Sequence, residues 1–153
     1  MLIGYSGEGN VVLSARTEKP HVRVLIVDDD PLFRLAVAAA LSADERLEFE
    51  VAEAGDGQQC LEAVASRRPD VVVLDLTMPV LDGITAAERI KQEWPEVRVV
   101  MLTSSGASAD RTRAERAGVE AFLQKASIVK AVGGSRRCQR RPDTDRLVSG
   151  HAD

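Results

Sequence analysis

Two apolar runs of this 153-residue chain end in carboxylates. Asp28 and Asp29 follow residues 22–27, and Asp75 follows residues 71–74. Carboxylates brought together repel one another, by about 1 kcal/mol per pair at roughly 4 Å in water and by more when they are partly desolvated. The repulsion is relieved when a cation sits among them or when their pKa values rise. Because no His or Cys adjoins them, these oxygen ligands favour a hard ion, Mg²⁺ before Zn²⁺.

A hydroxyl and an ammonium group follow two further apolar runs. Thr103 comes after residues 97–102, and Lys125 comes after residues 121–124. A carboxylate can act as a nucleophile and become an aspartyl phosphate. Phosphoryl transfer needs mainly positioning and charge stabilisation, which a metal ion, a lysine and a hydroxyl can supply. The spacing therefore indicates phosphoryl chemistry at Asp75, provided that the fold brings these groups to one place.

The elements that must position these groups alternate between strands and helices. Residues 71–74 are apolar and largely β-branched, which is typical of a strand buried on both faces of a parallel sheet. Asp30, which precedes Pro31, is interpreted as a helix N-terminal charge rather than a metal ligand. We expect strands at residues 22–27, 49–54, 71–74, 97–102 and 121–124, and helices at residues 32–42, 58–67, 84–94, 107–117 and 126–132.

This alternation predicts an α/β fold with a single doubly wound, flavodoxin-like sheet of five parallel strands in the order 2-1-3-4-5 and a short last helix. Open sheets of this kind hold their sites at the carboxyl ends of the strands, at the point where the strand order reverses. That point lies between the first and third strands, so Asp28, Asp29 and Asp75 should meet there. The groups that follow the fourth and fifth strands should flank them.

Charge is divided unevenly along the chain. We expect a flexible N-terminal extension at residues 1–21, one domain at residues 22–132 and a disordered basic tail at residues 133–153. Residues 22–125 carry 12 Lys+Arg and 19 Asp+Glu, a net charge of −7, whereas residues 126–153 carry a net charge of +3. The acidic domain argues against direct nucleic-acid binding by the folded part, and the arginines of the tail are interpreted as solvated.

Cysteine use and hydropathy favour a cytoplasmic setting. Cys60 and Cys138 lie far apart and match no metal-binding or redox spacing, so a reducing compartment is the default. No apolar run approaches the length that spans a membrane. The N-terminus lacks a basic segment followed by an apolar one, so no signal peptide is predicted.

The runs VLIVDD, VVVLDLTMPVLDG, VVMLTSS and AFLQK resemble the receiver domain of two-component response regulators. The resemblance covers roughly residues 22–126. It implies that Asp75 is the phosphoacceptor. It also implies a Mg²⁺ site formed by Asp28, Asp29, Asp75 and the backbone carbonyl of Thr77, with Asp29 binding directly and Asp28 through water.

The same resemblance assigns roles around the phosphoryl group. It implies that Thr103 and Lys125 contact that group, and that Thr103 and Phe122 form the conformational switch. Two features depart from the family pattern. Ala126 stands where many members carry a proline, although receivers with helix-turn-helix output domains often lack it too, and the last helix at residues 126–132 is shorter than the family's.

The resemblance implies a signalling switch that a sensor histidine kinase or a phosphotransfer protein phosphorylates, and that is no enzyme beyond its own phosphorylation and dephosphorylation. A homodimer is compatible with it. One alternative is an aspartate-nucleophile phosphatase of the haloacid-dehalogenase type, which would need a second Asp where Thr77 stands. Another is the receiver part of a DNA-binding transcriptional regulator whose output domain is missing. A nucleotide-binding module is disfavoured, because no Gly-rich loop follows the first strand.

Overall fold

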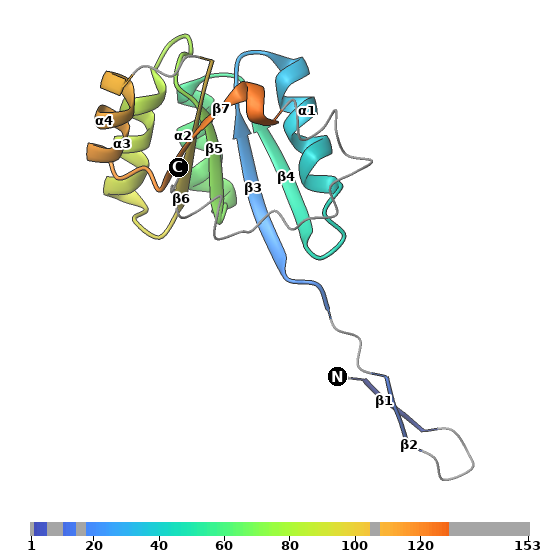
Figure 1. Cartoon of the computed structure of the whole chain (residues 1–153). Coiled ribbons are helices and arrows are strands. Elements are labelled where there is room, and N and C mark those ends of the chain that lie inside the picture. The colour runs from blue at the N-terminus through green and yellow to red at the C-terminus, as the bar shows by residue number, and fades with distance from the viewer. Residues whose placement is uncertain (1, 6–10, 15–17, 105–107, 129–153) are drawn as a thin grey trace.

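A parallel five-stranded sheet forms the centre of the domain (Figure 1). The computed structural model describes residues 2–5, 11–14, 18–104 and 108–128. The sheet has the order β4-β3-β5-β6-β7, which is the predicted 2-1-3-4-5 order when β3 is counted as the first strand. Its strands are β3 (His21–Val27), β4 (Glu48–Ala54), β5 (Val71–Asp75), β6 (Arg98–Thr103) and β7 (Ala121–Gln124).

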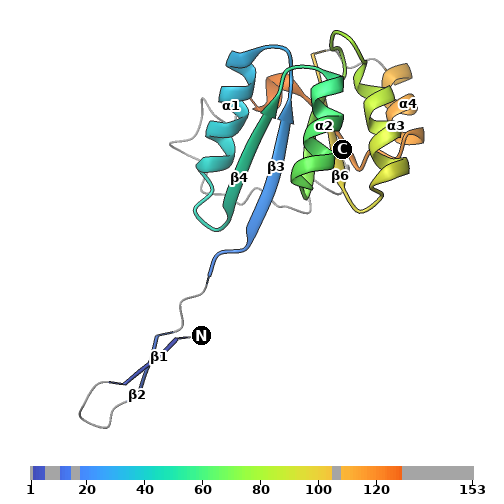
Figure 2. The ribbon, with the colours of Figure 1, turned by 180° about the vertical axis from the view of Figure 1, so that it is seen from behind.

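Helices cover both faces of this sheet (Figure 2). The helices are α1 (Pro31–Ser42), α2 (Gly57–Arg67), α3 (Gly83–Glu93) and α4 (Ser108–Arg116). Side chains of α1 pack on one face, where Phe33 and Val37 belong to the buried cluster, and the other three helices pack on the opposite face. No helix within the described parts of the chain is long and apolar enough to cross a membrane.

The alternation of side chains along each buried strand explains why the core has two halves. Successive residues of a strand point to opposite faces, so an uninterrupted apolar run supplies both. In β5, Val72 and Leu74 are fully buried against α2 and α3, while Val73 faces α1. The predicted burial of this strand on both faces is therefore confirmed.

Aspartates begin three of the helices. Asp30, Asp56 and Asp82 each accept a backbone hydrogen bond with the side chain, from the amides of residues 32, 59 and 85 respectively. A side-chain oxygen at this position satisfies one of the free N–H groups of the first turn. The interpretation of Asp30 as a helix N-terminal residue agrees with this geometry. Because each cap sits at the carboxyl end of a strand, the helices start beside the predicted site.

The N-terminal extension differs from its prediction. The sequence predicted no strand in residues 1–21, but the structure pairs β1 (Leu2–Tyr5) with β2 (Val11–Ser14) as an antiparallel two-stranded sheet. That prediction was wrong because two four-residue segments can pair through their main chains without a periodic pattern in either one.

The C-terminal end is described only in part. A helix begins at Lys125, and its described residues run to Ile128, which packs against the cluster on the α1 face. The rest of the predicted last helix, the predicted basic tail and Cys138 lie outside the described residues.

The loop between β5 and α3 contains a residue with an unfavourable backbone conformation. Val80 has φ 72° and is 80% exposed. A Cβ atom in the left-handed region costs roughly 1–2 kcal/mol, and a β-branched residue is a genuine outlier there. We expect Val80→Gly to raise the free energy of unfolding by about 1 kcal/mol, since the exposed side chain contributes little burial and glycine tolerates positive φ.

Urea denaturation measures this effect, and Val80→Ala is the matched control. Alanine removes the two γ-methyl groups but keeps the Cβ, so it should retain most of the strain. If the two variants change stability equally, the backbone at residue 80 is not strained and the explanation is wrong.

Candidate functional site

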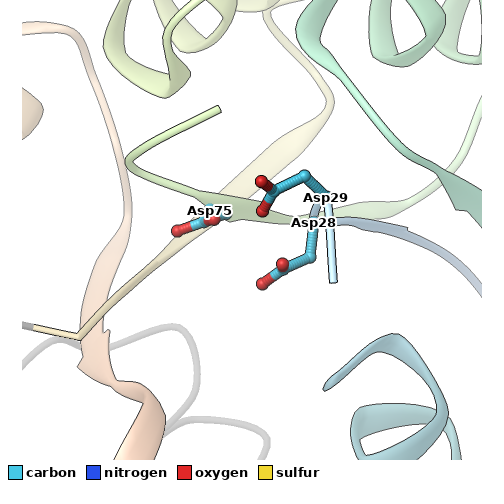
Figure 3. Close-up of side chains that lie close together, drawn as sticks. All are labelled: Asp28, Asp29 and Asp75. Carbon is cyan, nitrogen blue, oxygen red and sulfur yellow. The ribbon is translucent and has the colours of Figure 1, made fainter. Parts of the chain in front are cut away.

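Carboxylates from two adjacent strand ends converge at the carboxyl edge of the sheet. Asp28 and Asp29 directly follow β3, and Asp75 is the last residue of β5. One oxygen of each lies within 4.8 Å of the others. Figure 3 shows the three side chains directed toward a common space. Asp28 and Asp75 are buried, with exposed fractions of 1% and 5%, whereas Asp29 is exposed. The topology thus brings together the three acids that the sequence places far apart.

Lys125 completes the cluster. Its Nζ lies 2.6 Å from Asp28 Oδ2 and 3.3 Å from Asp75 Oδ2, so the ammonium group bridges the two buried carboxylates. It also lies 4.6 Å from the centre of the Phe33 ring, within the range of a cation–π contact. Burial opposes the charge of the ammonium, but its hydrogen bonds and ion pairs with the two aspartates outweigh that effect and raise the pKa of Lys125.

Asp75 has a carboxylate whose charge is only partly compensated. Burial and the neighbouring charge of Asp28 raise the pKa of Asp75. Lys125 opposes this effect, as does the backbone N–H of Thr77, which donates to Asp75 Oδ1 at 3.3 Å. Because the raising effects prevail, the site would gain from further positive charge.

The contacts of the Asp28 carboxylate show how much of the negative charge of the cluster is already compensated. Its Oδ1 accepts a hydrogen bond from the backbone N–H of Asp30 at 2.8 Å. Its Oδ2 is buried and receives no aligned hydrogen bond; the ion pair with Lys125 is its polar contact. That ammonium supplies the positive charge that a buried carboxylate oxygen needs, but a single ammonium cannot neutralise three carboxylates. The cluster therefore fits a divalent cation with oxygen ligands.

Comparison with known proteins identifies the family. The sequence model of the response regulator receiver domain matches residues 24–132. The chain belongs to this family. The two-component resemblance seen in the sequence is thereby confirmed, as is the flavodoxin-like fold that it implied.

The receiver is similar to parts of longer curated proteins. It is 36% identical over 117 residues to a protein-glutamate methylesterase/protein-glutamine glutaminase of Azospirillum brasilense, a match that covers 74% of this chain and 29% of the relative. It is 31% identical over 116 residues to the response regulator protein VraR of Staphylococcus aureus strain Mu3, which covers 76% of this chain and 55% of VraR. The chain therefore spans about a third to a half of these relatives.

Solved structures resemble the receiver over most of their length. The signal receiver domain of NarL from Mycobacterium tuberculosis is 34% identical with a TM-score of 0.65, and the match covers 78% of this chain and 99% of that domain. The Mn²⁺-bound form of response regulator Rcp1 is 25% identical with a TM-score of 0.65, and the match covers 74% of this chain and 90% of Rcp1.

The remaining predicted residues of the receiver site surround the cluster at different depths. Thr103 ends β6, is 2% exposed and stands in register with Gln124, the residue before Lys125. The side chain of Thr77 is exposed, and its backbone lies next to Asp75 through the hydrogen bond described above. Phe122 is half-buried in β7, on the sheet face that α2, α3 and α4 cover. Phe122 packs against the cluster that includes Ala114 of α4 and is paired in register with Met101 of β6.

Two residues of the receiver site were not predicted from the sequence. Phe33 lies under Lys125, and Arg34 donates from Nη1 to the backbone carbonyl of Asp28 at 2.6 Å. Both belong to the first turn of α1, immediately after the acidic pair. Helical periodicity could place Phe33 on the buried face, but it gives no signal that the neighbouring Arg34 turns back toward the acids.

Proposed function

We propose that this receiver accepts a phosphoryl group on Asp75 from a sensor histidine kinase or a phosphotransfer protein, and changes conformation as a result. The observation that carries the proposal is the Lys125 ammonium held at 2.6 and 3.3 Å from the two buried carboxylates. Such a group neutralises negative charge at the position where a phosphoryl group would arrive. The receiver family match supports the same assignment.

The cofactor we propose is Mg²⁺. The carboxylates of Asp28, Asp29 and Asp75, together with the backbone carbonyl of Thr77, would hold it. The excess of three carboxylates over the single Lys125 ammonium and the oxygen-only donor set support this choice. The similar response regulator Rcp1 has a Mn²⁺-bound form, which agrees with a divalent ion as the cofactor. When bound, Mg²⁺ would neutralise charge on the phosphoryl oxygens and on the acids.

The residues of the chain divide the transfer step among them. The Asp75 carboxylate attacks phosphorus; the bond from phosphorus to the donor histidine nitrogen breaks, and the electron pair leaves with the imidazole, which takes up a proton. Lys125 transfers its ion pair from Asp75 to the phosphoryl oxygens, and the Thr103 hydroxyl donates to them. We propose that Thr103 moves toward the phosphoryl group to make this hydrogen bond. That movement, coupled to Phe122, would be the conformational switch.

The wider role follows from the same proposal. We propose a receiver at residues 22–132 that works in the cytoplasm and is compatible with homodimer formation. We propose no enzymatic turnover of other substrates, because Thr77 stands where a phosphatase of the aspartate-nucleophile type needs a second carboxylate. The methylesterase relative extends well beyond the part that this chain matches.

A small phosphodonor tests the proposed function without the partner kinase. Incubation with acetyl phosphate and Mg²⁺ should add one phosphoryl group to each chain, and that group should decay slowly. Intact-mass spectrometry follows the modified protein, and an assay for released phosphate follows turnover. Many turnovers per chain would instead support a phosphatase.

Mg²⁺ is expected to raise the melting temperature of the wild type by a few degrees and to do so less in Asp29→Ala. A ligand that binds only the folded state adds about 1 kcal/mol when its concentration is about five times Kd. Asp29 is exposed, so its loss should leave the fold intact. Differential scanning fluorimetry with and without Mg²⁺ measures both shifts.

Glu45→Ala is the matched control, because Glu45 is another exposed carboxylate and lies in the turn after α1. Its Mg²⁺-dependent shift should equal that of the wild type. Equal shifts in Asp29→Ala and the wild type would remove Asp29 from the metal site.

A further inference from the structure

The geometry points to Arg34 as a positioning residue for the metal site: its guanidinium group fixes the peptide unit between Asp28 and Asp29, and thereby the way in which the two carboxylates meet a divalent cation. Arg34 itself would not touch the cation. The inference rests on the proposed Mg²⁺ site and goes beyond it by assigning the residue that holds the site in shape.

The Arg34 side chain connects three segments. It leaves α1, and its Nη1 donates to the backbone carbonyl of Asp28 at 2.6 Å. Its Nε donates to Glu53 Oε1 near the end of β4 at 3.3 Å. The side chain of Arg34 is only 20% exposed, compared with 51% for Glu53. A Cβ atom built at Gly55 would lie 3.8 Å from Arg34 Nη1, so the β4–α2 turn closes over the guanidinium group.

The orientation of the Asp28 backbone carbonyl determines how the chain continues into Asp29. The carbonyl of Asp28 and the N–H of Asp29 belong to one planar peptide unit, so holding the carbonyl orients the bond that leads to the Asp29 Cα. The other polar groups of Asp28 are held too: its N–H donates to the carbonyl of Ala54 at 3.1 Å, and its Oδ1 accepts from the N–H of Asp30 at 2.8 Å. Lys125 holds its Oδ2 at 2.6 Å, and Arg34 holds its backbone carbonyl.

Two simpler roles for Arg34 make different predictions. If Arg34 served only in the ion pair with Glu53, its loss would change stability slightly, because partly exposed pairs contribute little. If its positive charge acted only at a distance, its removal would strengthen cation binding. A positioning role predicts the opposite sign, since removing the groups that orient metal ligands typically lowers metal affinity by about 10–100-fold.

The test is the Mg²⁺ dissociation constant of the full chain, measured by isothermal titration calorimetry on folded protein. Arg34→Met keeps the length and packing of the side chain but removes its donors, and we expect its Kd to rise about tenfold. Arg34→Lys keeps the charge but cannot contact both Asp28 and Glu53 with a planar fork, so its Kd should also rise. Arg23→Gln breaks a comparable Arg–Glu contact on β3 and β4, at 3.7 Å, and should leave Kd unchanged.

The outcomes separate this inference from the function on which it rests. A wild type that binds no Mg²⁺ would reject both the metal site and the role of Arg34. A wild type that binds Mg²⁺, with Arg34→Met and Arg34→Lys binding equally well or more tightly, would reject only the positioning role. If Arg34→Met shows no cooperative thermal unfolding, Arg34→Lys decides the question by the same criterion.

Discussion

Asp75→Asn is expected to abolish phosphoryl uptake from acetyl phosphate while the domain stays folded. The amide has nearly the shape of the carboxylate, but it lacks the negative charge that makes the oxygen a nucleophile. Asp75 ends β5 in the middle of the cluster and lies 3.3 Å from Lys125 Nζ. Asp28 lies nearer to the same ammonium, at 2.6 Å, but its Oδ1 is already held by the N–H of Asp30. Intact-mass spectrometry after incubation with Mg²⁺ and acetyl phosphate measures the yield.

The thermal stability of Asp75→Asn gives a second readout, and the direction of its change follows from the raised pKa of Asp75. Burial and Asp28 raise the pKa of Asp75, so the folded state disfavours the ionised carboxylate relative to the unfolded state. As pH rises from the unfolded pKa through the folded pKa, the folded state binds more protons than the unfolded one, and the free energy of unfolding falls. Above the folded-state pKa that loss is complete, and the neutral amide avoids it. We therefore expect Asp75→Asn to unfold at a higher temperature than the wild type.

Asp110→Asn is the matched control, because Asp110 lies on α4 and pairs only loosely with Arg113, at 3.9 Å. It should be phosphorylated like the wild type. An Asp75→Asn protein with the wild-type yield of phosphoprotein would reject Asp75 as the acceptor.

The sheet could be predicted from the sequence because its central strand is apolar without interruption up to Asp75. Residues 71–74 leave no polar side chain to face solvent, which requires burial on both faces and hence helices above and below. Once five such units alternate, the handedness of the crossovers leaves few strand orders, and the observed one places Asp28 and Asp75 on adjacent strands. The acids could therefore be brought together before any coordinates were known.

Element ends were less predictable because local hydrogen bonds decide them. The sequence predicted a strand from residue 97, but the N–H of Val97 donates to the carbonyl of Trp94 at 3.0 Å, which makes it the end of a turn. The β6 strand accordingly begins at Arg98 and extends to Thr103. Val97 is nonetheless 2% exposed, so its apolar character reflected burial rather than strand pairing.

The contacts of Phe33 and Arg34 with the site were not predictable, because they depend on side-chain direction. A helix pattern shows that Arg34 is in the first turns of α1, but an arginine there is ordinarily solvated. Only the three-dimensional arrangement shows that the side chain turns back to the Asp28 carbonyl. The positive φ of Val80 is equally hidden, since no residue type in that loop requires it.

The turn from β5 into α3 should tolerate no side chain at its closest point. A Cβ atom at Gly83 would overlap the backbone carbonyl oxygen of Asp75 and would lie 2.9 Å from the Cα of Leu76. These neighbours are backbone atoms of the strand that carries the proposed phosphoacceptor, and the N–H of Gly83 also donates to the carbonyl of Leu76 at 3.0 Å. Gly83 cannot move away without disturbing the N-terminal cap of α3. The backbone of Asp75 cannot move away without displacing the Asp75 carboxylate.

Gly83→Ala is therefore expected to lower the free energy of unfolding by about 3 kcal/mol, at the upper end of the usual cost of overpacking, because the clash involves backbone atoms. Chemical denaturation measures the change. Gly55→Ala is the control: its added Cβ would meet only Gln59 Oε1 at 3.5 Å and Arg34 Nη1 at 3.8 Å, which are ordinary contacts, so stability should change by less than about 0.5 kcal/mol. Phosphoryl uptake by the folded fraction of Gly83→Ala should fall as well, since relief of the clash displaces Asp75. Stability and uptake that both match the wild type would mean that the turn relaxes without moving Asp75, and that the close approach at Gly83 does not position the carboxylate.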